Sequence, residues 1–315
     1  MIKLLLLKTE RAMLPEIEVY KSFLEKKNIL VDIKSISEIN EKIENYNIIW
    51  NFMGTDLKKY SKNQYIIHDY RSASSRCFPK LRDKIKKIIN IKPNIRIFLN
   101  KDLEKYYNFK DNIKTLNIDM GINDLFFKVD KKINKKYKFV YLGEINKRRE
   151  SDKLLKWFIE SEFKKENFLL IGPYDLEIYN KYNKYNNLIF LGKIKYKEVP
   201  EYLSLCEYAF NIIPNKFPFN FQTSTKLLEY LALNLKVISN KTDFVQKFLQ
   251  ENKNIDFITI NSYETISKEL LENFNFKFID MKKYSWEYIL RGKIEFIIND
   301  YLKYLSINKV EKGKD

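Results

Sequence analysis

The chain has little glycine, cysteine, histidine and arginine, and each shortage narrows what the protein can be. Its 315 residues include seven glycines, two cysteines and one histidine, and only 8 of its 58 basic residues are arginine. Cys77 and Cys206 provide neither a metal-ligand spacing nor a disulfide framework, which favours a reducing compartment. No stretch approaches the roughly 20 apolar residues of a membrane span, and the run Ile2–Leu7 is too short for the apolar region of a signal peptide. We therefore expect a cytoplasmic protein.

Several catalytic and cofactor motifs are also missing. The chain has no Asp-x-Asp pair, no His-x-x-x-His and no Cys-x-x-Cys, so nothing indicates a bound metal or another cofactor. It lacks Gly-x-x-x-x-Gly-Lys-Ser/Thr, which argues against a P-loop NTPase. The first predicted strand is not followed by Gly-x-Gly-x-x-Gly, which argues against a dinucleotide-dependent dehydrogenase.

The formal net charge of +17 raises the question of a nucleic-acid partner. Lysine supplies most of this charge, and it is spread through the sequence rather than gathered in a basic helix or an aromatic–basic strand motif. We therefore expect no nucleic-acid partner. A solvated lysine-rich surface explains the charge, and the alternative is attraction to an anionic membrane, where each basic residue contributes about 1 kcal/mol.

Short apolar runs alternate with helical patterns along most of the chain. Runs of this length predict strands that are buried on both faces. Those in the first half are Ile2–Leu7, Ile29–Ile33, Asn47–Phe52, Gln64–His68, Ile95–Leu99 and Lys114–Ile118. Those in the second half are Lys138–Leu142, Asn167–Ile171, Asn187–Leu191, Tyr208–Ile213, Leu235–Ser239 and Ile255–Ile260. This rhythm predicts an α/β protein with two doubly wound, Rossmann-like domains.

Helical patterns lie between many of these strands. They cover Pro15–Lys27, Pro79–Asn90, Glu150–Phe163, Val199–Leu205, Thr225–Leu233, Asp243–Glu251 and Tyr263–Asn273, and a long last helix is expected from about Ser285 to Leu305. The charged stretch Lys128–Lys136 has the composition of a linker. We therefore place an N-terminal domain at residues 1–130 and a C-terminal domain at 131–287, with a helix at about 288–306 that could pack back on the first domain.

Three of the glycines directly follow predicted strands of the C-terminal domain: Gly143, Gly172 and Gly192. A glycine at such a position allows a sharp turn and lets a ligand approach the backbone. In open α/β sheets, ligands bind beyond the carboxyl ends of the strands. The glycines therefore predict a nucleotide-type site in this domain.

The strongest local signal is the start of the predicted helix in TSTKLLEYLA. Its free amides and the helix dipole suit a phosphate. Lys226 in the first turn opposes the dipole but fits beside a bound phosphate, and Glu229 on the same helix face could accept hydrogen bonds from a ribose diol. The alternative is an ordinary Lys226–Glu229 ion pair. The candidate helix caps are Thr223, Ser224 and Thr225.

His68, the only histidine, ends a predicted strand of the N-terminal domain. As a neutral imidazole it could bond a sugar or phosphate oxygen, and as a base it could activate an acceptor hydroxyl, so it is a catalytic candidate. A hydrogen-bonded strand-end histidine is the alternative. Asp69 could orient it or cap the next turn. Arg71 and Arg76 could bind an anionic acceptor, although we expect them to be solvated.

The sequence that begins at Lys226 resembles a known motif. KLLEYLALNLKVIS looks like the donor-binding motif of GT-B glycosyltransferases of the family 4 type, approximately Lys-Leu-Phe-Glu-Tyr-Met-Ala-x-Gly-x-Pro-Val-Ile. Further similar pieces occur in the same order as in that family: NIDMGIN at 117–123, YLGEI at 141–145, LIGP at 170–173, NLIFLG at 187–192 and YSWE at 284–287. The resemblance covers about Val140–Trp286 and is vaguer before it.

The resemblance implies two Rossmann-like domains that face each other across a cleft holding a nucleotide-diphosphate sugar. Glu229 would bind the donor ribose, and Lys226 and the amides near Ser224 and Thr225 would lie near the diphosphate. Arg149 falls where such enzymes often carry a lysine against the phosphates. The remaining implied contacts are Lys147 and Arg148, as alternatives to Arg149, and Lys193 and Ile194 beside the base.

The sequence departs from the family pattern at three places. Phe221 stands where the first motif carboxylate is usual, Glu144 where an arginine usually follows Gly143, and Asn234-Leu-Lys where Gly-x-Pro is usual. The change at Phe221 leaves direct carboxylate contact with the transferred sugar open.

The resemblance implies a hexosyl- or related transferase that moves a sugar to a glycan or lipid-linked acceptor with retention and without a metal. Lys226 is then a second catalytic candidate, because it would stabilise the leaving diphosphate together with Arg149 and helix amides. Analogy places the reaction in surface polysaccharide assembly at the inner face of the cell membrane, with peripheral contact to anionic lipid. The alternatives are a nucleotide-sugar 2-epimerase of GT-B architecture, against which the single histidine argues, and a non-catalytic basic nucleic-acid-binding protein.

Overall fold

The computed structural model describes residues 1–10, 14, 16–39, 43–52, 55–74, 78–131, 133–219 and 222–312. The chain forms two compact units, one made of residues 1–121 and 286–315 and the other of residues 122–285. The change from one unit to the other falls at Gly121, before the linker-like stretch Lys128–Lys136. The reason is that Ile122 and Phe126 are fully buried in the core of the second unit, so the chain joins that unit earlier than its charge pattern indicates.

The first unit is built on a parallel sheet with the order β2-β1-β3-β4-β5-β6. The strands are β1 (Lys3–Lys8), β2 (Leu30–Ser35), β3 (Ile48–Phe52), β4 (Tyr65–Tyr70), β5 (Ile95–Phe98) and β6 (Lys114–Asn117). All six lie within two residues of the predicted bounds. Alternate residues of β4 serve opposite faces, so that Tyr65 and Ile67 join one core and Ile66 joins another.

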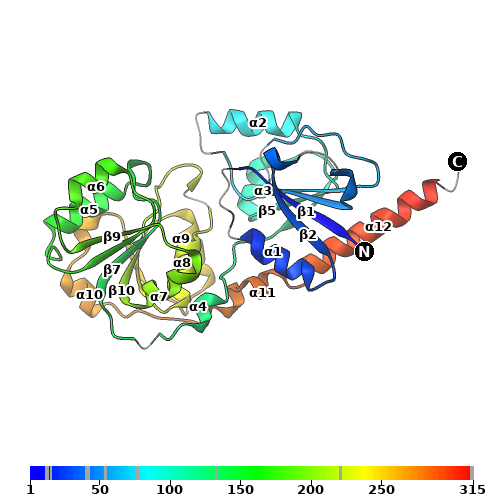
Figure 1. Ribbon diagram of the computed structural model, residues 1–315. Helices are drawn as coiled ribbons and strands as arrows, with labels where there is room; N and C mark the ends of the chain where they lie inside the picture. The colour runs from blue at the N-terminus through cyan, green and yellow to red at the C-terminus, as the bar shows by residue number, and fades with distance from the viewer. Residues whose placement is uncertain are drawn as a thin grey trace. The chain divides into compact units, whose positions relative to one another are not determined.

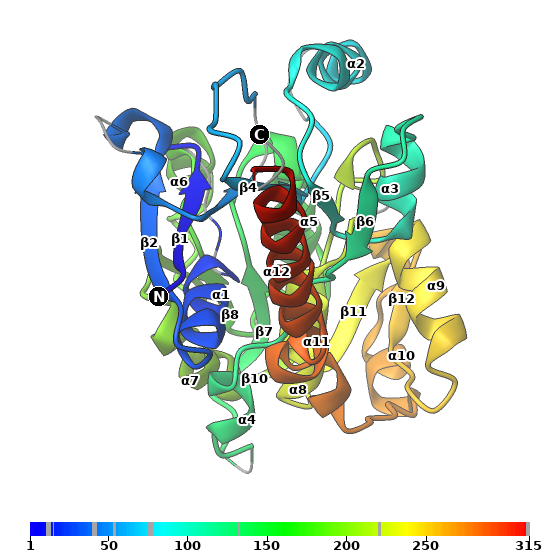
Figure 2. The ribbon, with the colours of Figure 1, turned by 90° about the vertical axis from the view of Figure 1, so that its right-hand side faces the viewer.

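Helices cover both faces of this sheet. The helices of the first unit are α1 (Glu16–Glu25), α2 (Pro79–Ile89), α3 (Lys101–Tyr107), α11 (Trp286–Leu290) and α12 (Lys293–Lys312). The residues of α1, α11 and α12 that face the sheet pack with Trp50, Tyr65 and Ile67 in one cluster. Figure 2 shows α12 running along this face of the sheet.

The C-terminal helical segment is interrupted, which corrects the prediction of one helix from Ser285 to Leu305. Helix α11 ends at Leu290 and α12 begins at Lys293. Gly292 between them has φ +73°, a left-handed conformation that ends a helix and that glycine adopts without strain. No helix in the described part of the chain is long and apolar enough to cross a bilayer.

The second unit contains a parallel sheet with the order β12-β11-β10-β7-β8-β9. The strands are β7 (Tyr137–Leu142), β8 (Phe168–Ile171), β9 (Leu188–Gly192), β10 (Cys206–Asn211), β11 (Lys236–Asn240) and β12 (Ile258–Ile260). Strands run outward from β7 in one direction and from β10 in the other, which is the Rossmann strand order with its switch point between β7 and β10. The two parallel sheets confirm the prediction of two Rossmann-like domains.

The helices of the second unit form a layer on each side of its sheet. They are α4 (Leu125–Lys128), α5 (Ser151–Glu160), α6 (Leu176–Tyr182), α7 (Val199–Ser204), α8 (Thr225–Ala232), α9 (Asp243–Glu251) and α10 (Lys268–Asn273). Helices α5, α6 and α10 pack on one face and α7, α8 and α9 on the other (Figure 1). The predicted helix Tyr263–Asn273 is a 3-10 turn, Tyr263–Thr265, followed by α10, because Ser267 caps a new helix by accepting from the Leu270 amide.

Candidate functional site

The three strand-end glycines lie beside one another at the carboxyl edge of the second sheet. Gly172 has φ +138°, and a Cβ atom added to it would lie 2.0 Å from the carbonyl oxygen of Gly143. The Gly172 amide donates to the carbonyl of Gly192 at 2.8 Å. Only glycine fits at position 172, and the edge near the switch point is therefore bare backbone that a ligand can approach closely.

A buried hydrogen-bond network fixes the start of α8 at this edge. Ser224 Oγ accepts from the Leu227 amide at 3.3 Å and donates to Asn211 Oδ1 at 2.7 Å. Asn211 Nδ2 in turn donates to Ser239 Oγ at 2.8 Å. Because Asn211 ends β10, which borders the switch point, the network places the N-terminus of α8 where an open α/β sheet binds its ligand.

A hydrogen bond and a left-handed residue fix the rest of α8 and its C-terminal end. The Leu142 amide, at the end of β7, donates to the hydroxyl of Tyr230 at 2.9 Å. Asn234 follows the helix with φ +55°. It therefore adopts the left-handed conformation that the glycine of the family pattern would supply, because asparagine tolerates this region better than most residues. The departure Asn234-Leu-Lys thus preserves the turn.

The first turn of α8 offers unpaired amides. The first amides of any helix lack intrahelical acceptors. Ser224 satisfies the Leu227 amide, whereas those of Thr225 and Lys226 have no acceptor in the described residues. Thr223, half-buried, leads into this turn. Free amides and the positive end of the helix dipole make this a site for a phosphate group.

Two cations lie close to that turn. Lys226 is half-buried and forms no direct ion pair with any described residue. Burial lowers the pKa of its ammonium group, and the charge of Arg149 lowers it further while Glu229 opposes both. The predicted alternative, an ordinary Lys226–Glu229 ion pair, is not formed. Together with Glu144, Glu229 offsets only part of the lowering of the Lys226 pKa, so an anion beside the two cations would be favoured.

Glu144 is the counter-ion of the arginine pair that follows β7. Its Oε2 lies 2.9 Å from Arg148 Nη2 and 3.4 Å from Arg149 Nε. Partial burial raises the pKa of Glu144, but the hydrogen bond from Arg148 and the charge of Arg149 outweigh it and the pKa is lowered. Lys147 instead pairs with Glu177 at 2.5 Å, both side chains being exposed. Of the three candidate cations, Arg149 is therefore the one coupled to Lys226.

Glu229 is buried one turn into α8, with 7% of its surface exposed. Burial raises its pKa to about 7, against the hydrogen bond from Tyr196 and the charge of Lys226. The Tyr196 hydroxyl donates to Glu229 Oε1 at 2.7 Å. The sequence analysis did not single out Tyr196, because a tyrosine four residues after a strand-end glycine carries no motif.

The two residues predicted beside the base follow Gly192. Lys193 is exposed, and Ile194 is half-buried against the core on the α7, α8 and α9 side. Their place at the end of β9 leaves both on the sheet edge that carries the glycines.

His68 lies inside the first unit. It has no exposed surface, and its Nε2 is 3.1 Å from Asp56 Oδ2. Burial lowers its pKa, while the hydrogen bond and charge of Asp56 oppose that effect. This is the hydrogen-bonded arrangement that the alternative describes, and a catalytic role for His68 stays a prediction. Asp69 does not orient His68, because successive residues of a strand face opposite sides and Asp69 accepts from Trp50 Nε1 at 3.0 Å.

The side chain of Arg71 is only 8% exposed and is held in an ion pair, which corrects the expectation that it is solvated. Its Nε lies 3.2 Å from Glu16 Oε1, and its Nη1 donates to the Ile118 carbonyl at 2.6 Å. It therefore joins the start of α1 to the end of the sheet.

Four positions named in the sequence analysis lie outside the described residues: Pro15, Arg76, Cys77 and Phe221.

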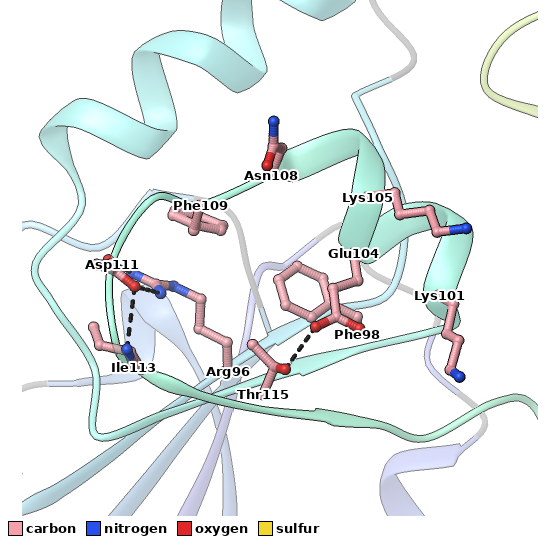
Figure 3. A pocket seen from close by; sticks show the side chains of 10 residues that line it. All are labelled: Arg96, Phe98, Lys101, Glu104, Lys105, Asn108, Phe109, Asp111, Ile113 and Thr115. Carbon is pink, nitrogen blue, oxygen red and sulfur yellow. Dashed lines mark hydrogen bonds and ion pairs between the residues drawn. The ribbon is translucent and has the colours of Figure 1, made fainter.

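A separate pocket of about 360 Å³ opens beside β5, β6 and α3 (Figure 3). Arg96 donates to both carboxylate oxygens of Asp111, at 2.6 and 2.8 Å, and its guanidinium lies 3.8 Å from the centre of the Phe109 ring. Glu104 accepts from Thr115 at 2.6 Å. The acidic groups Glu104 and Asp111 are therefore used within this wall, and the pocket is also lined by Lys101 and Lys105. Within the described residues, no three His, Cys, Asp or Glu side chains gather in a way that could hold a metal ion.

Comparison with known proteins supports the fold. No protein-family model matches the chain, and neither does any curated protein. Among solved structures, sucrose-phosphate synthase from Thermosynechococcus elongatus is similar with a TM-score of 0.71 and 14% identity, over 96% of this chain and 100% of that one. A glycosyltransferase from Rickettsia africae gives a TM-score of 0.63 and 13% identity, over 96% and 99%. HepE from Anabaena, in complex with UDP, gives 0.59 and 10%, over all of both chains.

The two Rossmann-like units and these similarities define the fold as that of GT-B glycosyltransferases. Identities of this size establish the fold alone. Membership in family 4 stays a prediction that rests on the motifs.

Proposed function

We propose that the protein is a glycosyltransferase that moves a sugar from a nucleotide-diphosphate sugar to a glycan or lipid-linked acceptor. The observation that carries the proposal is the N-terminus of α8, which is fixed at the switch point with free amides and with Lys226 beside Arg149. The HepE structures contain UDP, in one case with glucose, so uridine nucleotides are the first donors to test. That the two units enclose the donor remains a prediction.

In this proposal the donor spans the first turns of α8. The diphosphate accepts hydrogen bonds from the Thr225 and Lys226 amides and lies against the side chains of Lys226 and Arg149. The ribose hydroxyls donate to Glu229, whose Oε1 is already aligned by Tyr196. The glycine edge supports this placement, because it lets the ribose and phosphates approach the backbone.

The proposed reaction proceeds with retention and without a metal. The bond between the anomeric carbon and the diphosphate oxygen breaks, and its electron pair passes to the diphosphate. The acceptor oxygen bonds to the same face of the sugar, and its proton passes to the departing diphosphate. Lys226, Arg149 and the helix amides stabilise the developing charge, and removing one such donor typically costs about 3–4 kcal/mol in the barrier.

The acceptor and setting rest on analogy with other proteins of this fold. We propose transfer of a hexose or related sugar in surface polysaccharide assembly, at the inner face of the cell membrane.

The experiment is a thermal-shift screen with UDP-, GDP-, ADP- and CMP-sugars. A bound donor raises stability by about 2.7 kcal/mol at a hundredfold excess over its dissociation constant. Lys226→Ala should abolish the shift, whereas Lys197→Ala, an exposed lysine of the same unit, should leave it unchanged. If no nucleotide-sugar stabilises the wild-type protein, or if Lys226→Ala binds as well as the wild type, the proposal is wrong.

A further inference from the structure

Helix α2 packs against the rest of the first unit through its polar side. Asp83 is its only buried residue. The carboxylate accepts from Ser74 Oγ at 2.7 Å, from the Ser74 amide at 3.0 Å and from the Tyr106 hydroxyl at 3.0 Å. A surface helix normally packs its apolar stripe inward and exposes its charges. In α2 this orientation is reversed.

The opposite side of α2 is apolar and exposed. At 100° per residue, the large apolar side chains of the helix fall on one stripe that faces away from Asp83. Phe78, directly before the helix, extends the apolar surface and is 77% exposed. The exposed fractions on the stripe are 56% for Leu81, 45% for Ile85, 83% for Ile88 and 42% for Ile89. A contiguous apolar surface of this kind marks an interaction site rather than chance exposure.

Basic side chains border the apolar stripe. Lys84 and Arg82 flank it on either side, and Lys80 lies beyond Lys84 on the helical projection. All three are exposed and form no ion pair with any residue that the structure describes. Asp83, the one acid of the helix, is neutralised within the protein by Lys86 at 3.5 Å. The exposed surface of α2 therefore carries only positive charge around its apolar stripe.

We propose that α2 is a membrane-docking helix that inserts Phe78 and its apolar stripe into the interface of an anionic bilayer. Amphipathic helices with large apolar residues on one face and Lys or Arg beside them lie in the plane of such interfaces. The positive rim complements anionic headgroups, and the chain's net charge of +17 adds long-range attraction. Figure 1 shows α2 (cyan) at the outer edge of the first unit, and no described element of that unit covers the stripe.

This inference goes beyond sugar transfer, because it concerns a surface of the first unit and requires no donor. It names the lipid surface itself as the partner. A second copy of the chain would bring two positive rims together, which disfavours it, whereas an anionic bilayer offers both an apolar interior and opposite charge around it.

The test is co-sedimentation with vesicles of phosphatidylcholine alone and of phosphatidylcholine mixed with phosphatidylglycerol. The wild-type protein should bind the mixed vesicles and bind the neutral ones much more weakly. The triple variant Leu81→Gln, Ile85→Gln and Ile88→Gln should lose binding by on the order of a thousandfold, because burying each of the three side chains contributes about a tenfold factor. Lys80→Gln with Lys84→Gln should weaken binding to the mixed vesicles by roughly tenfold or more.

Matched controls keep the result specific to α2. Leu57 and Leu176 are 63% and 71% exposed elsewhere on the surface, so Leu57→Gln with Leu176→Gln should bind vesicles like the wild type. Lys253→Gln, at another exposed lysine, should do the same. Circular dichroism and the UDP thermal shift should be unchanged in all variants, which separates a failure of docking from a failure of the proposed donor site.

Three outcomes would overturn the inference. The wild type could fail to bind anionic vesicles, it could bind neutral and anionic vesicles equally, or the triple glutamine variant could bind as well as the Leu57 and Leu176 control. Sedimentation velocity adds a direct check on the other occupant. A wild-type dimer that the triple variant abolishes, together with no vesicle binding, would assign the stripe to a second copy of the chain.

Discussion

Replacing Glu229 with glutamine tests the electrostatics of the candidate site directly. Burial raises the pKa of Glu229 to about 7, compared with 4.5 for the unperturbed side chain. The folded protein therefore holds this proton at pH values where the unfolded chain has released it. Stability must fall as pH rises from about 4.5 to 7, and the loss is complete above the folded-state value.

The magnitude follows from the same two values. Each pH unit between them corresponds to about 1.4 kcal/mol, so ionising Glu229 should cost the folded state about 3 kcal/mol at pH 8. Glu229→Gln has nearly the same shape, keeps an oxygen for the Tyr196 hydroxyl and cannot ionise. The variant should match the wild type near pH 4 and be more stable by about 3 kcal/mol at pH 8.

The assay is urea unfolding followed by circular dichroism at a series of pH values. All other titrating groups are shared by the two proteins, so the difference between their unfolding free energies isolates Glu229. Glu251→Gln, at an exposed glutamate of α9, should run parallel to the wild type throughout. Parallel curves for Glu229→Gln and the wild type would refute the reasoning, because Glu229 would then be no costlier to ionise than an exposed glutamate.

Ionisation of Glu229 should strengthen donor binding, although it lowers the stability of the folded protein. A carboxylate accepts hydrogen bonds from ribose hydroxyls more strongly than a neutral acid or an amide does. UDP affinity of the wild type should therefore rise as pH increases through about 7. At pH 8, Glu229→Gln should bind UDP about fivefold to tenfold more weakly, a difference of about 1 kcal/mol. Calorimetric titration at pH 6 and pH 8 measures both effects, and a UDP affinity that is independent of pH in the wild type would argue against a role for Glu229 at the ribose.

The remaining predictions concern the frame and the phosphate end of the site. Ser224→Ala removes both the cap of α8 and a buried hydrogen bond, so urea unfolding should show a loss of about 1–2 kcal/mol, whereas a change below about 0.5 kcal/mol would contradict the network. Gly172→Ala places a Cβ atom 2.0 Å from the Gly143 carbonyl and should lower both stability and UDP binding; a normal thermal melt with normal binding would contradict this packing. Arg149→Gln should weaken UDP binding about tenfold or more, while Lys147→Gln, at an exposed and paired lysine two residues away, should change it little. Equal effects of the two substitutions would contradict the assignment of the phosphate contact to Arg149.

The strands could be predicted closely because burial on both faces leaves little freedom in their composition. Runs such as Leu4–Leu7 and Phe168–Ile171 are apolar at every position, a pattern that is typical of a strand buried on both faces. The start of α8 could be predicted to within about a residue, because three candidate caps, Thr223, Ser224 and Thr225, precede the apolar helical pattern; the structure shows that Ser224 is the cap. Local rules of this kind determined the fold class and the frame of the site.

What the sequence did not reveal depends on contacts between distant residues. In the sequence, Gly292 reads as a glycine that a helix tolerates, and only its positive φ shows that the helix ends there. Arg71 looks solvated because its partners, Glu16 and the Ile118 carbonyl, are 55 and 47 residues away. Tyr196 reaches Glu229 across 33 residues, and no spacing rule connects them. Side chains that meet through the tertiary structure leave no periodic pattern to read.

The charges of the candidate site in the second unit are those that the proposed donor would complement. Lys226 and Arg149 are neighbouring cations at the positive end of a helix, and Glu144 alone compensates the arginine. One turn further along, Glu229 is buried with a pKa of about 7, so its charge is only partly developed at neutral pH. An anion placed at the first turn would satisfy the cations and the free amides, and hydroxyl donors placed one turn further in would favour the ionised form of Glu229. The proposed donor supplies both groups. Its diphosphate would lie at the first turn of α8, and its ribose hydroxyls would reach Glu229 about one helical turn further along, so the two groups together support the proposal more strongly than either does alone.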